Sequence, residues 1–233
     1  MTETAKKRAV NVEASEAVED YVKAIYSLQR QGGEPVSTSA LADRLGVTAA
    51  SASAMVKKLA GMNLVRHLRY HGFVLTPLGR RLALEILRHH RLLELYLAKA
   101  FDMPWDQVHA EAEALEHVLS EELEERIAAK LGNPTVDPHG DPIPTRDGAI
   151  DEGHTVSLAE LELGDRGTFV RVSDSDPAML RYLSAKRIRP GQVLEVREKQ
   201  PFGGSLVVRV ANREHALGGE LARAMQMDRV AGP

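Results

Sequence analysis

The sequence predicts a mainly α-helical protein with small β parts, divided into three domains. Two short helical segments joined by a single glycine follow a first amphipathic segment, which is the pattern of a helix-turn-helix. Apolar residues then recur at helical spacing to about residue 131, and the last third holds short β-type runs separated by glycine-rich turns. We expect a winged helix-turn-helix domain at 1–76, a helical domain at 77–150 and a small barrel-like β domain at 151–233.

The helices of the first domain can be predicted one by one. Apolar residues at helical spacing favour a helix from Ser15 to Leu28, and Gly32-Gly33 ends the pattern. The segment Ser37–Ser39 can cap a second helix, after which Gly46 supplies a turn. A third helix is expected from its cap at Thr48 to about Ala60.

A hairpin and a long helix should follow. Short apolar runs at 64–65 and 73–75 flank a polar stretch, which predicts a two-stranded wing. Thr76 can cap the next helix with Pro77 at its first position, and helical spacing continues to about Phe101. This helix is expected to lead from the wing into the middle domain.

The rest of the chain is predicted from periodicity and turn residues. One helix should run from about Asp106 until Gly132 ends it, with apolar residues from Val108 to Ile127 on one stripe. Residues 133–155 are rich in Pro, Gly and Asp and form the expected linker, although Ile143 between two prolines indicates some packing. The last domain should contain strands at Thr168–Val172, Val193–Arg197 and Leu206–Val210 and a helix near Pro177–Lys186.

Composition excludes several classes of protein. The chain has no cysteine, which rules out a disulfide framework, a zinc–thiolate site and an iron–sulfur cluster and leaves oxygen and imidazole as metal ligands. No apolar run approaches the roughly 20 residues that cross a bilayer, and residues 1–10 lack the apolar core of a signal peptide. We therefore expect a cytoplasmic protein with no membrane contact.

Charge is distributed unevenly along the chain. Residues 1–90 hold 13 Lys and Arg against 8 Asp and Glu, residues 91–150 hold 5 against 13, and residues 151–233 hold 12 of each. A basic first segment favours a polyanion, whereas the acidic middle segment repels phosphate and attracts cations.

The third helix presents hydroxyls, small side chains and cations on the face that its apolar residues leave open. Small residues allow close approach to base edges, and lysines can meet phosphates. The alternative is a small helical domain that touches no nucleic acid. The candidate DNA contacts are Thr48, Ser51, Ser53, Lys57 and Lys58, with Ser37 and Thr38 at the start of the second helix and Arg66 and Arg69 in the wing.

Residues of the metal-ligand type gather in the middle domain. Glu113, Glu116 and His117 are spaced to share one face of a helix, and His109 lies one turn earlier. The candidate set also contains His90 and Glu94, four residues apart on the preceding helix, and Asp20 on the first helix.

These ligands suit a hard or borderline cation. Mn(II) and Fe(II) accept mixed carboxylate and imidazole shells of five or six ligands, whereas structural zinc sites are usually tetrahedral and rich in cysteine. An acidic cluster alone would also fit a solvated helix face, but two clusters on helices joined by a short connection favour a metal. His89 and His154 lack such a pattern, so we expect them on the surface.

Several segments, in the same order along the chain, resemble segments of one protein family. They are residues 15–21 and 24–26, the helix-turn-helix at 42–59, residues 89–94 and 109–117, the loop at 137–144, and residues 156–233. Together they resemble the diphtheria-toxin-repressor family of metal-dependent bacterial transcription repressors, and the last segment is similar to the family's SH3-like, or FeoA-like, C-terminal β-barrel domain.

This resemblance implies up to two metal sites per subunit. The primary site would use Asp20, Glu113, Glu116 and His117, and the ancillary site His90, Glu94 and His109 with Asp176 of the third domain. Asp20 and Glu113 resemble the manganese-responsive branch, because the iron-responsive branch has the softer Met and Cys there. Lys23 stands where manganese-responsive relatives often present a glutamate, and Met179 where an iron-responsive relative offers a glutamine.

The implied function is repression of metal-homeostasis genes, with operator binding activated by Mn(II) or alternatively by Fe(II). A metal shared by Asp20 and the middle-domain ligands would hold the DNA-binding domain in place. A homodimer formed through apolar residues such as Leu115, Leu119 and Leu123 would bind a palindromic operator in double-stranded DNA. A metal-independent winged-helix regulator and a metallohydrolase or metal-dependent oxidase stay open, although no nucleophile or general-base motif accompanies the cluster.

Overall fold

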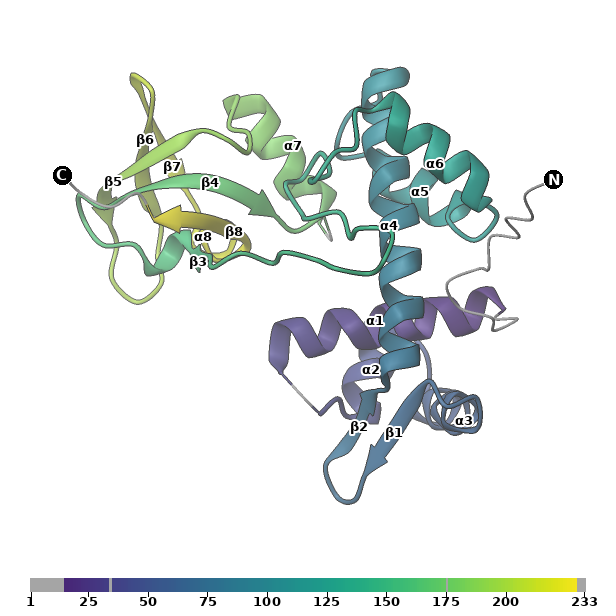
Figure 1. Ribbon diagram of the computed structural model, residues 1–233. Helices are drawn as coiled ribbons and strands as arrows, with labels where there is room; N and C mark the ends of the chain where they lie inside the picture. The colour runs from purple at the N-terminus through teal and green to yellow at the C-terminus, as the bar shows by residue number, and fades with distance from the viewer. Residues whose placement is uncertain (1–14, 34, 175, 230–233) are drawn as a thin grey trace. The chain divides into compact units, whose positions relative to one another are not determined.

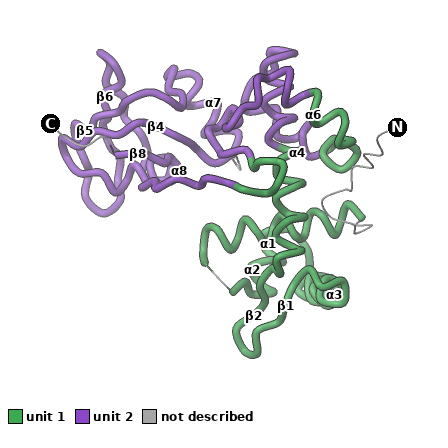
Figure 2. The backbone as a smooth tube through the Cα atoms, viewed as in Figure 1, with its two compact units in different colours: residues 1–90, 114–126, 144–149 green, residues 91–113, 127–143, 150–233 purple. Residues whose placement is uncertain are grey.

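The computed structural model of the protein describes residues 15–33, 35–174 and 176–229. They form two compact units, which Figure 2 distinguishes by colour. Unit 1 takes the chain up to residue 90 together with residues 114–126 and 144–149, and unit 2 takes residues 91–113, 127–143 and 150 onward. None of the helices in the described ranges is long and apolar enough to cross a membrane.

Unit 1 begins with a helix-turn-helix and a wing (Figure 1). The Ser37 hydroxyl accepts the backbone N–H of Ala40 at 3.1 Å, and the Thr48 hydroxyl accepts that of Ser51 at 3.1 Å, so both predicted caps are confirmed. Gly46 ends the second helix in the left-handed conformation at φ 64°. The elements are α1 (Glu16–Gly32), α2 (Thr38–Leu45), α3 (Ala49–Gly61), β1 (Val65–Leu68), β2 (Gly72–Leu75) and the start of α4 (Pro77–Ala100).

The core of this unit lies among the first three helices and the wing. Val18, Val22 and Ile25 line one face of α1 and are fully buried, as are Leu41 and Leu59 from the other two helices. The wing strands pair antiparallel. The packing confirms the predicted winged helix-turn-helix and leaves the opposite face of α3 in solvent.

The helix predicted from about Asp106 to Gly132 is wrong as a single element. The chain forms α5 (Val108–Leu115) and α6 (Glu121–Lys130), with a turn between them. The carbonyl of Glu116, which a continuous helix would use internally, instead accepts a hydrogen bond from Nδ1 of His89 at 3.2 Å. Ser120 then starts α6, because its hydroxyl accepts the backbone N–H of Leu123 at 3.3 Å. Glu116 and His117 consequently lie in a turn.

The prediction that His89 lies on the surface is also wrong. Its side chain is buried, and its Nε2 lies 3.1 Å from Oε2 of Glu124. Arg88 donates to the other carboxylate oxygen of Glu124 at 2.5 Å. The end of the α4 portion in unit 1 is therefore joined to α6 by a buried ionic network.

Unit 2 contains a six-stranded antiparallel sheet with the strand order β3-β8-β4-β5-β6-β7. Its apolar side chains pack into one core that includes Leu158, Phe169, Leu194 and Val208. The predicted strands and the helix at 177–186 are present, while β3, β7, β8 and α8 were not predicted. The elements are β3 (Val156–Ser157), the 3-10 helix η1 (Leu158–Glu160), β4 (Arg166–Val172), α7 (Pro177–Lys186), β5 (Val193–Lys199), β6 (Leu206–Val210), β7 (Arg213–Leu217), α8 (Gly219–Ala224) and β8 (Met225–Arg229).

Residues 137–143 of the loop pack against β4 within unit 2. The carbonyl of His139 accepts the backbone N–H of Val172 at 3.1 Å, and Ile143 is buried, as its position between prolines indicated. Gly140 has φ 88°, and a Cβ there would lie 1.8 Å from the carbonyl oxygen of Val170. Only glycine allows this close approach of the loop to the strand.

We expect Gly140→Ala to lower the free energy of unfolding by about 3 kcal/mol, because the substitution combines left-handed strain with a backbone clash. Gly164→Ala is the matched control: its φ is 86°, and nothing lies within 4 Å of an added Cβ. It should lose only about 1 kcal/mol. Urea unfolding of both variants measures the difference, and equal losses would contradict a steric role for Gly140.

Candidate metal centres and nucleic-acid interface

The third helix presents its candidate DNA contacts to solvent. Ala52, Val56 and Leu59 are buried, and the remaining face is open. Tyr70 at the wing tip is 88% exposed, with the guanidinium of Arg69 4.9 Å from its ring centre. Of the candidates, Thr38 is half-buried, and the exposed ones are Ser37, Thr48, Ser51, Ser53, Lys57, Lys58, Arg66 and Arg69.

Three predicted ligands converge within unit 1. Asp20 comes from α1, whereas Glu116 and His117 come from the turn after α5, and one ligand atom of each lies within 4.8 Å of the others. Nε2 of His117 is 3.0 Å from Oδ1 of Asp20 and 3.4 Å from Oε1 of Glu116. We call these three residues the first centre.

The ring of His117 is oriented by a residue that the sequence analysis missed. Its Nδ1 lies 2.7 Å from Oε2 of Glu19, and a carboxylate can only accept, so Nδ1 carries a proton. Nε2 then faces Asp20 and Glu116. Histidines that ligate metals are commonly held in this way by a carboxylate on the other ring nitrogen. The available signal was the position of Glu19 beside Asp20 on α1.

Glu116 is fully buried and is balanced by cations. Its Oε2 lies 2.6 Å from Nδ1 of His90, and its Oε1 accepts from Nζ of Lys23 at 2.5 Å. Burial alone would raise the pKa of Glu116, but the hydrogen bonds and charges of His90 and Lys23 outweigh it and hold the pKa below its usual value. His90, assigned by resemblance to the ancillary site, is thus hydrogen-bonded to a candidate ligand of the first centre.

A second group of ligands lies within unit 2. Nδ1 of His109 is 3.2 Å from Oε1 of Glu94 and 3.1 Å from Oδ2 of Asp174. Hydrogen bonds with Asp174 and Glu94 raise the pKa of His109 to about 10. Glu113, assigned by resemblance to the primary site, lies on α5 with its Oε1 3.8 Å from Nε2 of His109.

The third-domain residue at this group is Asp174. Asp176, the residue expected from the resemblance, is the N-cap of α7, where its Oδ1 accepts the backbone N–H of Ala178 at 2.8 Å. Asp174 is half-buried, and its charge interacts with His109 and His139. The pattern Asp176-Pro177 at the start of a helix was the available signal that Asp176 would serve as a cap.

His139 and Asp137, which were not predicted as ligands from the sequence, extend the second group. Nε2 of His139 donates to the carbonyl of Trp105 at 2.7 Å, which leaves Nδ1 directed at Oε2 of Glu94, 3.5 Å away. His139 is fully buried, and its Nδ1 makes no hydrogen bond among the described residues. We call Glu94, His109, Asp137, His139 and Asp174 the second centre.

The charges of the second centre are strongly coupled. Burial and the charges of Glu94 and Asp141 raise the pKa of Asp137 to about 8, against the opposing effect of Arg91. Burial lowers the pKa of His139, yet the adjacent Glu94 raises it on balance to about 9. Carboxylates that share a buried space in this way attract either protons or a cation.

Both centres fit a divalent cation by their donor chemistry. Each offers carboxylate oxygens and imidazole nitrogen without sulfur, and each contains a histidine whose second ring nitrogen is anchored by an acceptor. The residues that would hold the ion in the first centre are Asp20, Glu116 and His117. In the second centre they are Glu94 with His109 and Asp174, or Glu94 with Asp137 and His139.

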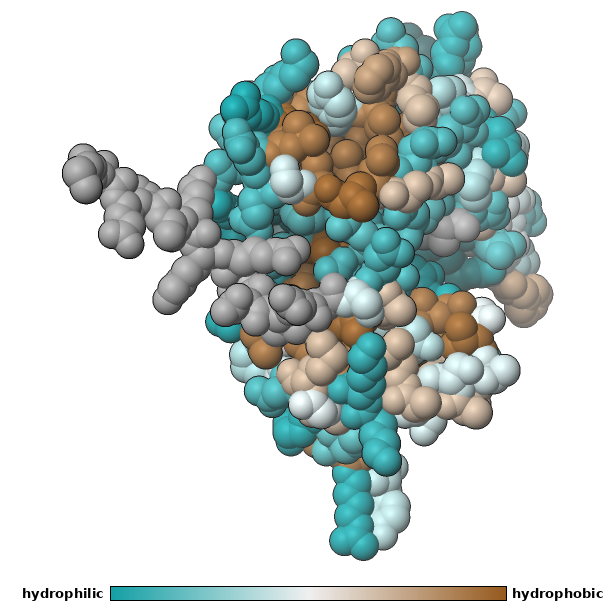
Figure 3. All heavy atoms as spheres, turned by 90° about the vertical axis from the view of Figure 1, so that its right-hand side faces the viewer, coloured by the Kyte–Doolittle hydropathy of each residue, from teal (hydrophilic) through white to brown (hydrophobic). Residues whose placement is uncertain are grey.

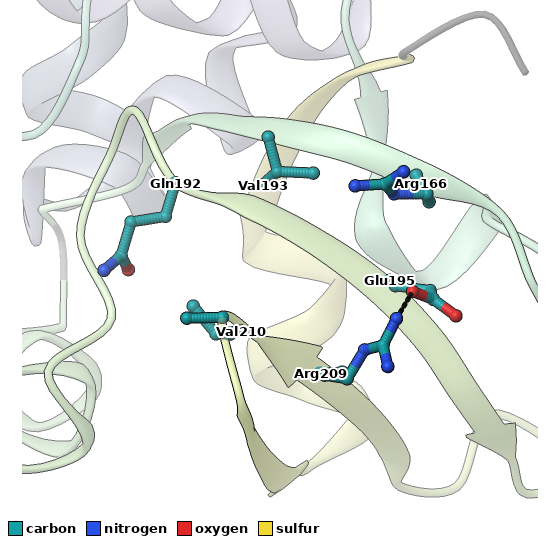
Figure 4. A pocket seen from close by; sticks show the side chains of 7 residues that line it. Arg166, Gln192, Val193, Glu195, Arg209 and Val210 are labelled. Atoms are coloured by element: carbon teal, nitrogen blue, oxygen red, sulfur yellow. Dashed lines mark hydrogen bonds and ion pairs between the residues drawn. The ribbon is translucent and has the colours of Figure 1, made fainter.

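A separate cavity of about 280 Å³ lies on the β5–β6 side of the sheet (Figure 4). Arg166, Val193 and Val210 line it with Glu195 and Arg209. Figure 4 shows Arg209 directed at Glu195, and the two form an ion pair at 2.5 Å. None of these residues belongs to either centre, so the cavity adds nothing to the metal chemistry.

Comparison with known proteins identifies one family over most of the chain. Residues 13–73 match the N-terminal DNA-binding domain of iron-dependent repressors, residues 76–145 match their metal-binding and dimerisation domain, and residues 156–229 match the FeoA domain. The iron-dependent repressor IdeR of Mycobacterium tuberculosis is 32% identical over 230 residues, which cover 94% of this chain and 99% of IdeR.

Other relatives agree. The diphtheria toxin repressor of Corynebacterium diphtheriae is 33% identical over 184 residues, covering 78% of this chain and 74% of that protein. A manganese-dependent transcriptional repressor solved in complex with manganese is 41% identical, with a TM-score of 0.86 over 91% of this chain and all of that one. The chain therefore belongs to the family of iron- and manganese-dependent transcriptional repressors that includes the diphtheria toxin repressor.

Proposed function

We propose that this protein represses metal-homeostasis genes by binding a palindromic operator as a cytoplasmic homodimer when Mn(II), or alternatively Fe(II), is available. The convergence of Asp20 with Glu116 and His117 is the observation that carries this proposal. Asp20 lies on a helix of the helix-turn-helix unit, whereas the other two come from the acidic segment that follows α5. Metal occupancy is thereby linked to the position of the DNA-binding helices.

The residues of the first centre act by charge and position. Glu19, Asp20 and Glu116 are carboxylates that meet around a single imidazole, so they repel one another unless positive charge is supplied. A bound divalent cation would supply that charge. Glu19 holds the ring of His117, and the fixed ring in turn aims Nε2 at Asp20.

Oxygen-rich ligands favour Mn(II) over softer metals. Asp20 and Glu116 contribute carboxylate oxygen and His117 contributes imidazole nitrogen, a set suited to Mn(II) and Fe(II). A relative with 41% identity is a manganese-dependent repressor, and others are iron-dependent repressors. We assign Mn(II) as the preferred activator and Fe(II) as the alternative.

The apolar surface around α5 and α6 suits a dimer interface. Leu115, Val118 and Leu123 are exposed, at 39%, 72% and 49%, and Leu119 is half-buried. Figure 3 shows apolar side chains gathered in a patch on the face that it turns to the viewer. Burying such a patch against its copy in a symmetric dimer would present two α3 helices to successive major grooves, about 34 Å apart.

Loss of the buried charge at position 116 should uncouple metal from DNA. In Glu116→Gln the amide keeps the shape of the side chain but cannot carry negative charge. We expect the gain in operator affinity on adding Mn(II) to be at least tenfold smaller in this variant than in wild type, a difference of about 1.4 kcal/mol. The operator can be obtained by selection from random duplexes with Mn(II) present, and anisotropy titrations give the affinities. Glu111→Gln, at an exposed position on α5, is the control. Unchanged stimulation in Glu116→Gln would refute the proposal and leave a metal-independent regulator.

The two lysines on α3 should determine the salt dependence of DNA binding. We expect Lys57→Ala and Lys58→Ala each to weaken binding on all duplexes and to reduce the slope of log affinity against log salt by about 1, since each removes one phosphate contact. Lys130→Ala, an exposed lysine on α6, should leave the slope unchanged. Slopes that are the same in all three variants would place the DNA elsewhere.

Metal binding should tighten as pH rises. Burial lowers the pKa of His117, but the hydrogen bond to Glu19 and the charges of Glu116 and Asp20 raise it on balance above its usual value. Below that pKa a cation must displace the proton on Nε2, so affinity should increase up to about tenfold per pH unit for each proton displaced. Calorimetry of Mn(II) binding in buffers of different ionisation enthalpy counts the protons released. Replacing His117 by Gln should reduce the count by about one, and an unchanged count would exclude His117 as a ligand.

A further inference from the structure

Lys23 places an ammonium inside the first centre. It lies on α1, one turn after Glu19 and Asp20, and its side chain is only 17% exposed. Its Nζ donates at 2.5 Å to Oε1 of Glu116, the same oxygen that lies 3.4 Å from Nε2 of His117. The lysine therefore occupies the Glu116 oxygen that faces the other ligands of the centre.

The ammonium of Lys23 and a divalent cation would compete for Oε1 of Glu116. The ammonium has three donors and no lone pair, so Lys23 cannot become a ligand while it stays protonated. Like charges a few ångströms apart in a partly buried site repel strongly. When a metal binds to the first centre, Lys23 must therefore either move away from Oε1 or stay there and weaken metal binding by charge repulsion.

The same contact keeps the metal-free centre assembled. Glu116 is fully buried, and a buried carboxylate without a compensating cation is costly. Lys23 compensates at Oε1 and His90 at Oε2, so both oxygens of Glu116 are satisfied with no ion bound. Removing Lys23 would destabilise the metal-free form and relieve repulsion in the metal-bound form, and both effects strengthen metal binding.

We infer that Lys23 is a tethered competitor for the metal, one that raises the metal concentration at which the repressor becomes active while holding its metal-free site together. This inference rests on the proposed metal-activated function. With the same ligand residues but without Lys23, the repressor would become active at a lower metal concentration.

The test compares charge, length and context at position 23. Lys23→Met and Lys23→Gln remove the charge at similar length, Lys23→Arg keeps it, and Lys130→Gln is the control on the exposed end of α6. Mn(II) affinity is measured by calorimetry on the full chain, and the melting temperature is measured without metal. We expect the Met and Gln variants to bind Mn(II) at least tenfold more tightly and to melt lower without metal, while Arg and the control stay near wild type.

A double variant tests whether the gain in Mn(II) affinity depends on the carboxylate of Glu116. In Glu116→Gln the lysine loses the carboxylate that it contacts in this centre, so adding Lys23→Met should give a much smaller gain in affinity than it gives in the wild-type background. Unchanged or weaker Mn(II) binding in both the Met and Gln variants, or a gain of the same size with Glu116→Gln, would overturn the inference. If wild type and Glu116→Gln bind Mn(II) alike, the first centre is not a metal site and the proposed function fails instead.

Discussion

Burial of the Glu116 carboxylate is the constraint on which the rest of unit 1 depends. A charged side chain with no exposed surface must be compensated, and His90 and Lys23 do so from α4 and α1. The backbone at the same residue is tied to His89, which ends α5 and turns the chain toward α6. The break in the helix and the assembly of the first centre are therefore one structural event.

The helix α1 carries this constraint into the DNA-binding core. Val18, Val22 and Ile25 pack inward, and α1 also contacts both α2 and α3. Asp20 and Lys23 lie on another face of the same helix and meet the turn after α5. Because packed helices move as rigid pieces, the proposed metal at the turn would act on α3 through α1.

The sequence was a good guide wherever local chemistry determined the structure, and a poor one where a distant partner did. Ser37, Gly46 and Thr48 fix the helix-turn-helix through their own backbone contacts, so that part could be predicted. The turn at Glu116 could not, since its flanking residues favour helix and the hydrogen bond that breaks the helix comes from 27 residues away. The position of His139 likewise depends on a distant residue, Trp105. His139 donates a hydrogen bond to its carbonyl and stacks on its ring, with the ring centres 5.7 Å apart.

Anchoring of one ring nitrogen distinguishes the candidate ligands His117 and His139 from His89. Glu19 fixes His117 and the Trp105 carbonyl fixes His139, which leaves one nitrogen of each ring facing carboxylates. His89 has the same residue type and similar burial, but both of its nitrogens are engaged by Glu116 and Glu124. Spacing along the chain cannot make this distinction, because it depends on which acceptor the fold brings to the second nitrogen. In a chain without cysteine these acceptors, together with the acidic residues at 91–150, would determine where the proposed divalent cation binds.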